Sequence, residues 1–262
     1  GGDATTSQGV AAANLLEEAI LREGPDTVGA FIAEPVQGAG GVIVPQDDYF
    51  PRIREICDKY DVLLISDEVI TGFGRTGTWF GLEHWGIEPD IMQFAKGITS
   101  GYVPLGGIGV SDKIKTAIDS TPPDRRWMHA YTYSGHPTCC AVALANLKII
   151  EEEGLVQRAA EMGNRLLEGL HTLDDMPGVG EVRGLGMMAA VELVADKATK
   201  QEFPSTAKVG ARVQREMNQR GLYTRARGDV ICLAPSLVTT AEQIDRIVEI
   251  VREASPAAVQ TA

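Results

Sequence analysis

Two buried apolar runs, each associated with a charged residue at its end, constrain the fold of this chain more than any other feature. The run at 62–69 contains Asp67 near its end, and the run at 90–95 is followed directly by Lys96. Short runs rich in Ile, Leu and Val are typical of strands buried inside an α/β sheet. Ligands of such sheets bind at the carboxyl ends of the strands. We therefore expect Asp67 and Lys96 to lie at neighbouring strand ends, beside a ligand site.

Apolar runs alternate with amphipathic stretches along the chain, which favours an α/β fold with a parallel or mixed sheet covered by helices. The predicted strands cover residues 28–36, 62–69, 90–95, 104–111 and 228–235, and a strand pair covers 177–194. The predicted helices cover residues 11–24, 48–61, 136–153, 155–173, 206–221 and 239–254. Pro137 suits a first helical turn, and Thr240 with Gln243 predicts a capping box. The glycine-rich stretches 37–41 and 72–81 are predicted loops.

Gly154 separates two long predicted helices, and we place a domain boundary there. The boundary divides the chain into residues 1–153, part of a large α/β domain, and residues 154–262, a smaller α+β domain. The chain opens on a glycine and its first methionine is Met92, so we expect it to begin inside a longer protein.

Composition excludes several classes of function. A net charge of −12 argues against a nucleic-acid-binding protein, which needs a basic surface. No apolar run reaches the length of a membrane span. The histidines and cysteines show no metal-ligand spacing, so no metal is predicted. The four cysteines are expected to be free thiols in a reducing cytoplasm: Cys57, Cys139, Cys140 and Cys232.

A lysine and an acid at one sheet edge are the two protein groups that pyridoxal 5'-phosphate (PLP) chemistry needs. A desolvated lysine is a nucleophilic amine, and a carboxylate keeps the pyridine nitrogen protonated. Val69, two positions beyond Asp67, points the same way and could press on a ring face. Other interpretations stay open: Asp67 with Glu68 also fits a solvated turn. Lys96 also fits a strand-end cation whose aliphatic stem packs on apolar surface.

Longer motifs carry a family resemblance. The motifs are AEPVQGAGGVIVP at 33–45, ISDEVITGFGRTGTWFG at 65–81, PDIMQFAKGITSGYVPLGG at 89–107, YTYSGHPTCCAVALANLKIIEEE at 131–153 and VRGLGMMAAVEL at 182–193. They resemble class III (subgroup II) PLP-dependent aminotransferases over nearly the whole chain. The resemblance implies PLP-dependent transferase fold type I: a mostly parallel sheet flanked by helices, plus a smaller α+β C-terminal domain.

The resemblance also implies roles for four residues. Lys96 would form the Schiff base with PLP and move a proton during the reaction. Asp67 would pair with the pyridinium nitrogen, and Val69 would pack on one face of the ring. Thr132 matches a threonine that donates to the cofactor phosphate of the neighbouring subunit. A homodimer with shared active sites is therefore expected.

Two arginines are candidates for substrate binding. Arg225 matches an arginine that binds a substrate carboxylate and swings away for an apolar amine, a role that suits a bidentate guanidinium. Arg227 lies close enough in the sequence to be an alternative, and a surface charge is the plainer interpretation of either.

Glu34 and Gln37 match positions near the family's active site, where the glutamate pairs with an arginine in the absence of a substrate carboxylate. A strand terminus explains Glu34 equally well. Trp79 and Tyr102 could line an apolar amine pocket, and both also fit ordinary packing.

Within the family, four short motifs resemble the ω-amine:pyruvate branch: GTWFG at 77–81, SGYVPLGG at 100–107, YTYSGHP at 131–137 and RARGDVICLAPSL at 225–237. This resemblance implies transamination between an amine or ω-amino acid and a keto acid such as pyruvate, by a ping-pong mechanism. Two alternatives remain. One is another reaction on the same fold: an aminomutase, racemase or decarboxylase. The other is a truncated, inactive fragment, because the chain has no Gly-Ser dipeptide and so lacks the family's Gly-Ser-x-Ala phosphate loop.

Overall fold

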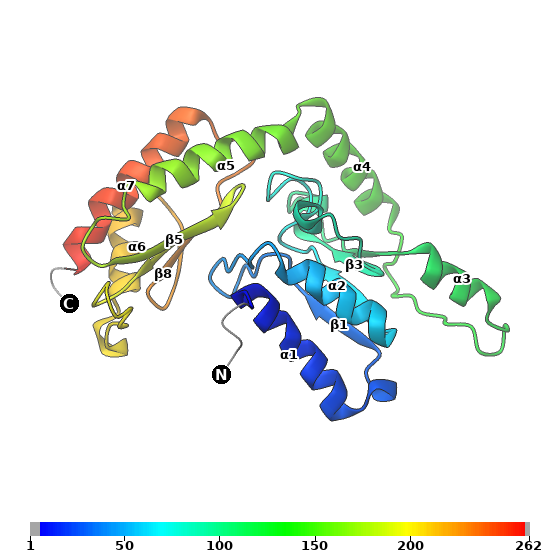
Figure 1. Ribbon diagram of the computed structural model, residues 1–262. Coiled ribbons are helices and arrows are strands. Elements are labelled where there is room, and N and C mark those ends of the chain that lie inside the picture. The colour runs from blue at the N-terminus through cyan, green and yellow to red at the C-terminus, as the bar shows by residue number, and fades with distance from the viewer. Residues whose placement is uncertain (1–5, 260–262) are drawn as a thin grey trace. The chain divides into compact units, whose positions relative to one another are not determined.

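The computed structural model describes residues 6–259, which form two compact units (Figure 1). The first unit comprises residues 6–35, Pro45–Phe73 and Phe80–Glu152. The second comprises Val36–Val44, Gly74–Trp79 and the residues from Glu153 onward. The division between them along the chain therefore falls at Glu152, but two loops of the N-terminal half belong to the second unit. No helix within the described residues is both long and apolar enough to cross a membrane.

The first unit contains a four-stranded mixed sheet in the order β1-β2-β3-β4. The strands are β1 (Ala30–Ala33), β2 (Leu63–Asp67), β3 (Ile91–Phe94) and β4 (Gly107–Val110). The first three are parallel, and β4 is antiparallel to β3. The mixed sheet expected from the sequence is thus confirmed, with shorter strands than the apolar runs.

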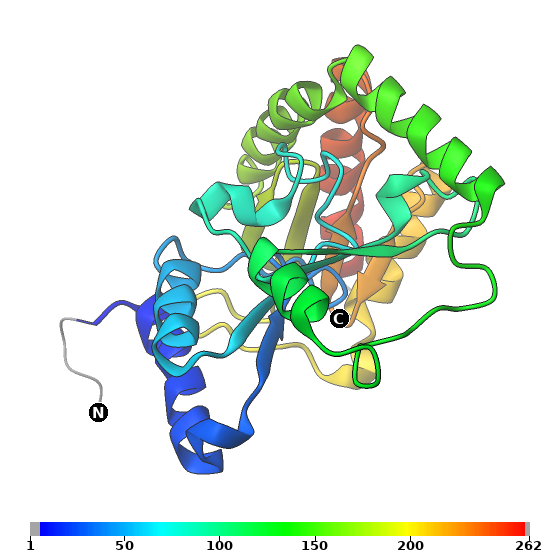
Figure 2. The ribbon, with the colours of Figure 1, turned by 90° about the vertical axis from the view of Figure 1, so that its right-hand side faces the viewer.

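The α-helices among the described residues of this unit are α1 (Gln8–Glu23), α2 (Tyr49–Tyr60), α3 (Asp112–Ser120) and α4 (Pro137–Glu152). Helices α1 and α2 pack together against the sheet through a buried core that includes Ile20, Phe50 and Leu64. The predicted start of α1 was three residues late, because Ser7 caps the helix by accepting a hydrogen bond from the Val10 amide at 3.1 Å. Helix α3 was not predicted. Figure 2 shows the long irregular connection that leads from α3 to α4.

The second unit contains an antiparallel sheet in the order β5-β6-β8-β7. Its strands are β5 (Val179–Leu185), β6 (Met188–Leu193), β7 (Arg225–Arg227) and β8 (Val230–Leu233), and its helices are α5 (Leu155–His171), α6 (Val209–Gln219) and α7 (Ala241–Val259). The predicted strand pair is confirmed as the β5-β6 hairpin. The predicted capping box is also confirmed, since the Thr240 amide donates to Gln243 Oε1 at 2.9 Å and the Gln243 amide to Thr240 Oγ1 at 3.3 Å.

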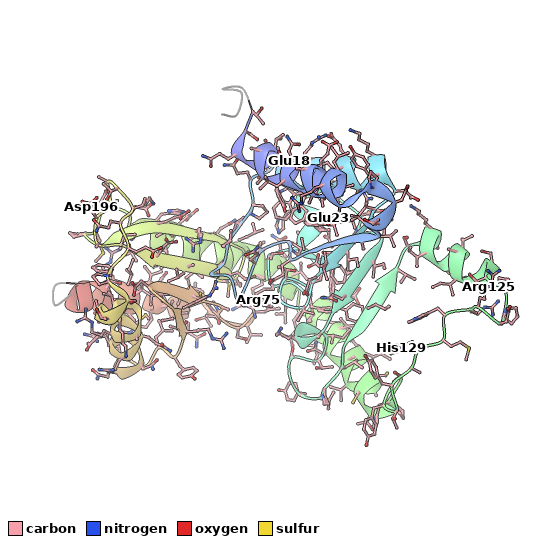
Figure 3. The ribbon with its side chains drawn as sticks, turned by 90° about the horizontal axis from the view of Figure 1, so that it is seen from below. Glu18, Glu23, Arg75, Arg125, His129 and Asp196 are labelled. Carbon is pink, nitrogen blue, oxygen red and sulfur yellow. The ribbon has the colours of Figure 1, made fainter. Side chains whose placement is uncertain are left out.

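Arg75 holds the loop Gly74–Trp79 within the second unit (Figure 3). Its guanidinium donates to the carbonyl oxygens of Met187, at 3.1 Å, and Pro235, at 2.5 Å. The Met187 amide returns a hydrogen bond to the Arg75 carbonyl at 2.9 Å. Burial lowers the pKa of Arg75, and the carbonyl dipoles offset part of the cost of burying this cation.

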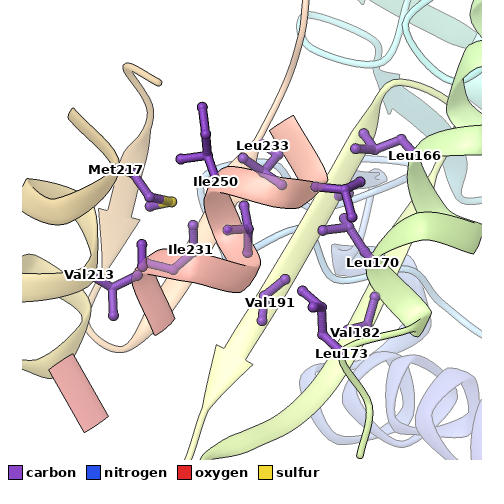
Figure 4. Packing of buried hydrophobic residues seen from close by; sticks show 14 of the residues in the cluster. Leu166, Leu170, Leu173, Val182, Val191, Val213, Met217, Ile231, Leu233 and Ile250 are labelled. Carbon is purple, nitrogen blue, oxygen red and sulfur yellow. The ribbon is translucent and has the colours of Figure 1, made fainter. Parts of the chain in front are cut away.

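The core of the second unit lies between its sheet and its three helices (Figure 4). Leu166 and Leu170 of α5, Met217 of α6 and Ile231 of β8 are all fully buried. Each such side chain contributes about 1.5–3 kcal/mol to folding. Gly154, with φ of +61°, separates α4 from α5, as its position in the sequence predicted.

Candidate active site

The parallel strands of the first sheet bring three candidate residues to one edge. In the pairing of β2 with β3, Asp67 lies opposite Gln93, and the Glu68 amide donates to the Gln93 carbonyl at 2.9 Å. Lys96 follows three residues after Gln93. Glu34 follows β1 at the same edge, because Ala33 pairs with Ser66. Asp67, Lys96 and Glu34 therefore leave adjacent strands at their carboxyl ends, where ligands of such sheets bind.

Asp67 is half-buried, and one of its two carboxylate oxygens accepts a hydrogen bond within the described residues. Its Oδ1 accepts a hydrogen bond from the Val69 amide at 3.1 Å, which fixes the orientation of the carboxylate. Within residues 6–259 its Oδ2 has no hydrogen-bond partner. This oxygen is available to a donor from a ligand. Val69, two residues after Asp67, is also half-buried.

Lys96 is exposed and opens a short 3-10 turn, η3 (Lys96–Ile98). Its φ of +42° lies in the left-handed region, which costs a residue with a side chain roughly 1–3 kcal/mol. Such a conformation persists only where surrounding contacts stabilise it. No carboxylate among the described residues pairs with the Lys96 amine, so the amine is accessible to a ligand.

The turn after Lys96 packs tightly on the loop that follows β2. A Cβ at Gly97 would lie 3.1 Å from the Phe73 Cβ and 3.3 Å from the Gly72 carbonyl oxygen, closer than most side-chain contacts, so the two segments approach tightly here. Phe73 packs edge-to-face on Phe94, the last residue of β3, at a centroid distance of 5.7 Å. The segments carrying Asp67 and Lys96 are thereby joined by close packing.

Glu68 anchors this loop and was missed by the sequence analysis. Its side chain is buried, and its carboxylate accepts hydrogen bonds from Thr71 Oγ1, the Gly81 amide at 2.8 Å, the Leu82 amide at 3.1 Å and Ser66 Oγ at 3.2 Å. The two amides open the 3-10 helix η2 (Gly81–Trp85). These contacts exclude a solvated turn for Glu68. The available signal was strand alternation, which places Glu68 on the same buried face as Ser66.

Thr132 lies in an exposed turn of the long connection between α3 and α4. The Ser134 amide donates to the Tyr131 carbonyl and the Tyr131 amide to Ser134 Oγ, both at 2.9 Å, and these bonds close the turn. Among the described contacts, none links Thr132 to Asp67 or Lys96. Tyr102 is also exposed and lies in the first unit.

The remaining substrate-binding candidates lie in the second unit. Trp79 is half-buried, and Gln37 is exposed and forms an antiparallel bridge with Ile43. Arg227 donates from Nη1 to the Gly40 carbonyl. Arg225 opens β7 and is exposed, with no hydrogen bond or ion pair from its side chain within residues 6–259. Arg225 therefore has the more available guanidinium of the two arginines.

Comparisons with known proteins agree on one family. The family model described as aminotransferase class-III matches residues 3–254. A putrescine–pyruvate aminotransferase of Pseudomonas aeruginosa is 48% identical over 255 residues, which are 97% of this chain and 55% of that protein. A diaminobutyrate–2-oxoglutarate transaminase of Halomonas elongata is 48% identical over 237 residues, 89% of this chain and 50% of that protein. The chain thus spans about half the length of the curated relatives it matches.

Solved structures give the same result. An (S)-enantioselective ω-transaminase from Thermomicrobium roseum superposes with a TM-score of 0.91 and 52% identity, covering 95% of this chain and 56% of that one. A transaminase from the marine bacterium Virgibacillus superposes with a TM-score of 0.92 and 46% identity, covering 97% of this chain and 58% of that one.

Proposed function

The chain belongs to the class-III aminotransferase family, and on that premise we propose that the protein transfers an amino group between a primary amine or ω-amino acid and a keto acid, with PLP as cofactor. Its fold is PLP-dependent transferase fold type I, as the sequence motifs predicted and its structural neighbours confirm. The observation that carries the proposal is the placement of Asp67 and Lys96 at the carboxyl ends of adjacent parallel strands.

The residues at this edge fit PLP. Lys96 offers an exposed amine without an ion-pair partner among the described residues, and Asp67 offers an oxygen without a hydrogen-bond partner there. A carboxylate that keeps one oxygen available suits a protonated ring nitrogen, which is a single N–H donor. When bound, PLP supplies a conjugated ring that withdraws electrons from the carbon bearing the amino group.

The chain's own residues would each act on one part of the site. Lys96 would hold the cofactor covalently through Nζ and, when its amine is free again, would accept and return a proton at that nitrogen. Asp67 Oδ2 would accept the ring N–H, while the Val69 amide keeps the carboxylate oriented through Oδ1. Val69 would pack its side chain on the ring.

Pyruvate is the keto acid we propose, with an amine donor and a ping-pong cycle in which the deaminated donor leaves before the keto acid binds. The relative from Pseudomonas aeruginosa, whose name pairs putrescine with pyruvate, supports this choice. Arg225 would bind the keto-acid carboxylate, since its guanidinium is exposed. Glu34 and Trp79 stay predicted substrate-binding residues.

We further propose a homodimer with shared active sites, in which Thr132 donates to the phosphate bound in the partner subunit. The connection that carries Thr132 exposes large aromatic side chains, with Tyr131 75% and Tyr133 79% accessible, near the labelled His129 (Figure 3). Aromatic residues are enriched at protein interfaces. Sedimentation equilibrium tests the dimer, and a monomer at every concentration would contradict it.

Borohydride reduction tests the proposed cofactor site. The protein is incubated with PLP, reduced, and digested for peptide mass mapping. We expect a phosphopyridoxyl group on Lys96 and its loss in Lys96→Ala. Lys113, whose amine pairs with Asp61 at 2.8 Å, is an internal control for surface labelling. Label spread evenly over Lys113 and Lys96 would contradict an assembled site in this chain.

Half-reactions then test transamination itself. An amine donor added to the PLP-loaded protein should convert the cofactor to its amine form, and pyruvate should restore the original absorbance. A racemase or decarboxylase would not give this paired change, because the amino group leaves with the substrate and does not remain on the cofactor. An aminomutase would return the amino group to its own substrate and not to pyruvate. Absence of any conversion by a correctly labelled protein would contradict the proposed reaction.

A further inference from the structure

Helix α4 contacts the turn that follows Lys96 through the side chain of Asn146. The Asn146 amide nitrogen donates to the carbonyl oxygens of Gly97, at 2.9 Å, and Ile98, at 3.1 Å. Its Oδ1 accepts a hydrogen bond from Ser100 Oγ at 2.8 Å. Both polar groups of the asparagine side chain are therefore used, in three hydrogen bonds to residues within four positions of Lys96.

The helix itself fixes the position of this asparagine. Ala143 and Ile150, three residues before and four after Asn146, are buried, so these positions lie on the buried face of α4. Asn146 is half-buried on that face. Its side chain thus reaches the turn from a rigid element rather than from a loop.

The turn needs such a support because its backbone is strained. Lys96 has φ of +42° and Ser100 has φ of +50°, both in the left-handed region. Backbone conformations of this kind persist only when surrounding contacts fix them. The direction of the Lys96 Cα–Cβ bond, and hence of its amine, depends on this conformation. Relaxation of the turn would therefore change the direction in which the amine points.

We propose that Asn146 is a positioning residue for Lys96: its contacts with Gly97, Ile98 and Ser100 hold the lysine amine toward the ligand edge of the sheet. The inference rests on the proposed function for the role of Lys96, but the contacts themselves do not involve the cofactor. Asn146 does not touch the reacting atoms and acts only through the turn.

Two variants and one control isolate the effect. Asn146→Asp keeps the size of the side chain and the acceptor for Ser100 Oγ, but it replaces both N–H donors with an oxygen that faces two carbonyls. Asn146→Ala removes all three contacts. Ala143→Gly weakens the same helix on the same face while leaving the Asn146 contacts in place, so it controls for loss of helix stability.

The first measurements use cofactor-free protein. Hydrogen exchange follows the amides of Ile98, Thr99 and Ser100, and competitive acetylation over a range of pH follows the reactivity of Lys96 relative to other lysines. We expect roughly tenfold faster exchange at these amides in Asn146→Asp, as the loss of one or two hydrogen bonds implies. The acetylation profile of Lys96 should change in the same variant. In Ala143→Gly, exchange at Ile98, Thr99 and Ser100 and the acetylation profile of Lys96 should match those of the parent. Only the amides of α4 itself should exchange faster.

The second measurement is the yield of phosphopyridoxyl label on Lys96 after PLP addition and reduction. We expect a several-fold lower yield in Asn146→Asp and Asn146→Ala than in the control variant. Equal acetylation profiles and equal exchange at Ile98–Ser100 in all variants would overturn the inference. If the unmodified protein takes no label at Lys96, the proposed cofactor site fails, but exchange and acetylation still decide the role of Asn146.

Discussion

The carboxylate of Glu68 accepts a hydrogen bond from the backbone amide of Gly81, at 2.8 Å, and so ties the end of β2 to the start of η2. The two residues lie 13 positions apart. The intervening segment leaves the first unit at Gly74 and returns at Phe80. Glu68 therefore closes a loop whose near end begins directly after Asp67.

Removing the charge of Glu68 should destabilise the first unit. Glu68→Gln places an NH2 group where one oxygen now accepts hydrogen bonds, which leaves a buried amide donor of Gly81 or Leu82 unsatisfied. We expect a loss of about 1–3 kcal/mol in the free energy of unfolding, measured by urea denaturation. Glu88→Gln, at an exposed position, is the control and should stay within about 0.5 kcal/mol of the parent. Equal stability of the two variants would contradict the anchoring role.

The strand ends of the candidate site could be predicted because their signal is local. The run ending at Asp67 and the run before Lys96 are short, apolar and bounded by turn residues, which is the pattern of buried strands. The alternation of strands with helices along the chain as a whole favours parallel neighbours, although only the short 3-10 helix η2 separates these two strands. The strands are shorter in the structure than in the prediction, and Asp67 is the last residue of β2.

Other parts of the site could not be predicted because they depend on pairing between distant segments. The hydrogen bond between Ser100 and Asn146 joins residues that lie 46 positions apart in the sequence. No local pattern distinguishes this asparagine from a solvent-exposed one. Strand β7 was missed because a three-residue strand with two arginines has no apolar alternation, and it forms by pairing with β8. The assignment of two N-terminal loops to the second unit rests likewise on tertiary contacts, including those from Arg75.

The stability of the first unit should depend on pH through Asp90. Although burial by itself raises the pKa of Asp90, hydrogen bonds from the Leu64 amide, at 2.8 Å, and Arg54 Nη1, at 2.9 Å, hold it below its ordinary value of 3.8. A carboxyl group with a lowered pKa in the folded state stabilises that state above its unfolded pKa. The contribution is lost as pH falls from about 3.8 through the folded pKa.

Asp90→Asn tests this dependence by urea unfolding at a series of pH values. The variant should be less stable than the parent at pH 7, and the difference should shrink as pH falls below about 3.8. Asp58→Asn is a matched control, because Asp58 pairs with the same Arg54 but is 67% exposed. Its effect should stay within about 1 kcal/mol at neutral pH. A stability difference for Asp90→Asn that does not vary with pH would contradict the prediction.

The cysteines should differ in reactivity according to their burial. Cys57 is fully buried in α2, and burial raises its pKa to about 11. Its thiol should therefore resist iodoacetamide at pH 8 in the folded protein and react after unfolding in urea. Cys139 and Cys140, half-buried in the first turn of α4, should react first. Mass mapping of alkylated peptides would contradict this if Cys57 reacted as fast as Cys139.

We expect Arg225 to bind the substrate and Arg227 to have a structural role. Arg227 donates to the Gly40 carbonyl, so Arg227→Ala should speed hydrogen exchange at the Gly41 and Val42 amides of that loop, by roughly three- to tenfold for one lost hydrogen bond. Arg225→Ala should leave that exchange unchanged, because its side chain makes no hydrogen bond within the described residues.

In turnover assays Arg225→Ala, and not Arg227→Ala, should have the larger effect. Arg225→Ala should raise the KM for pyruvate at least tenfold, since a charge-assisted hydrogen bond to the keto-acid carboxylate is lost. It should change the half-reaction with an amine that lacks a carboxylate much less. Arg227→Ala should leave the KM for pyruvate near that of the parent. A larger KM effect from Arg227→Ala than from Arg225→Ala would reassign the carboxylate to Arg227 and overturn the role given to Arg225.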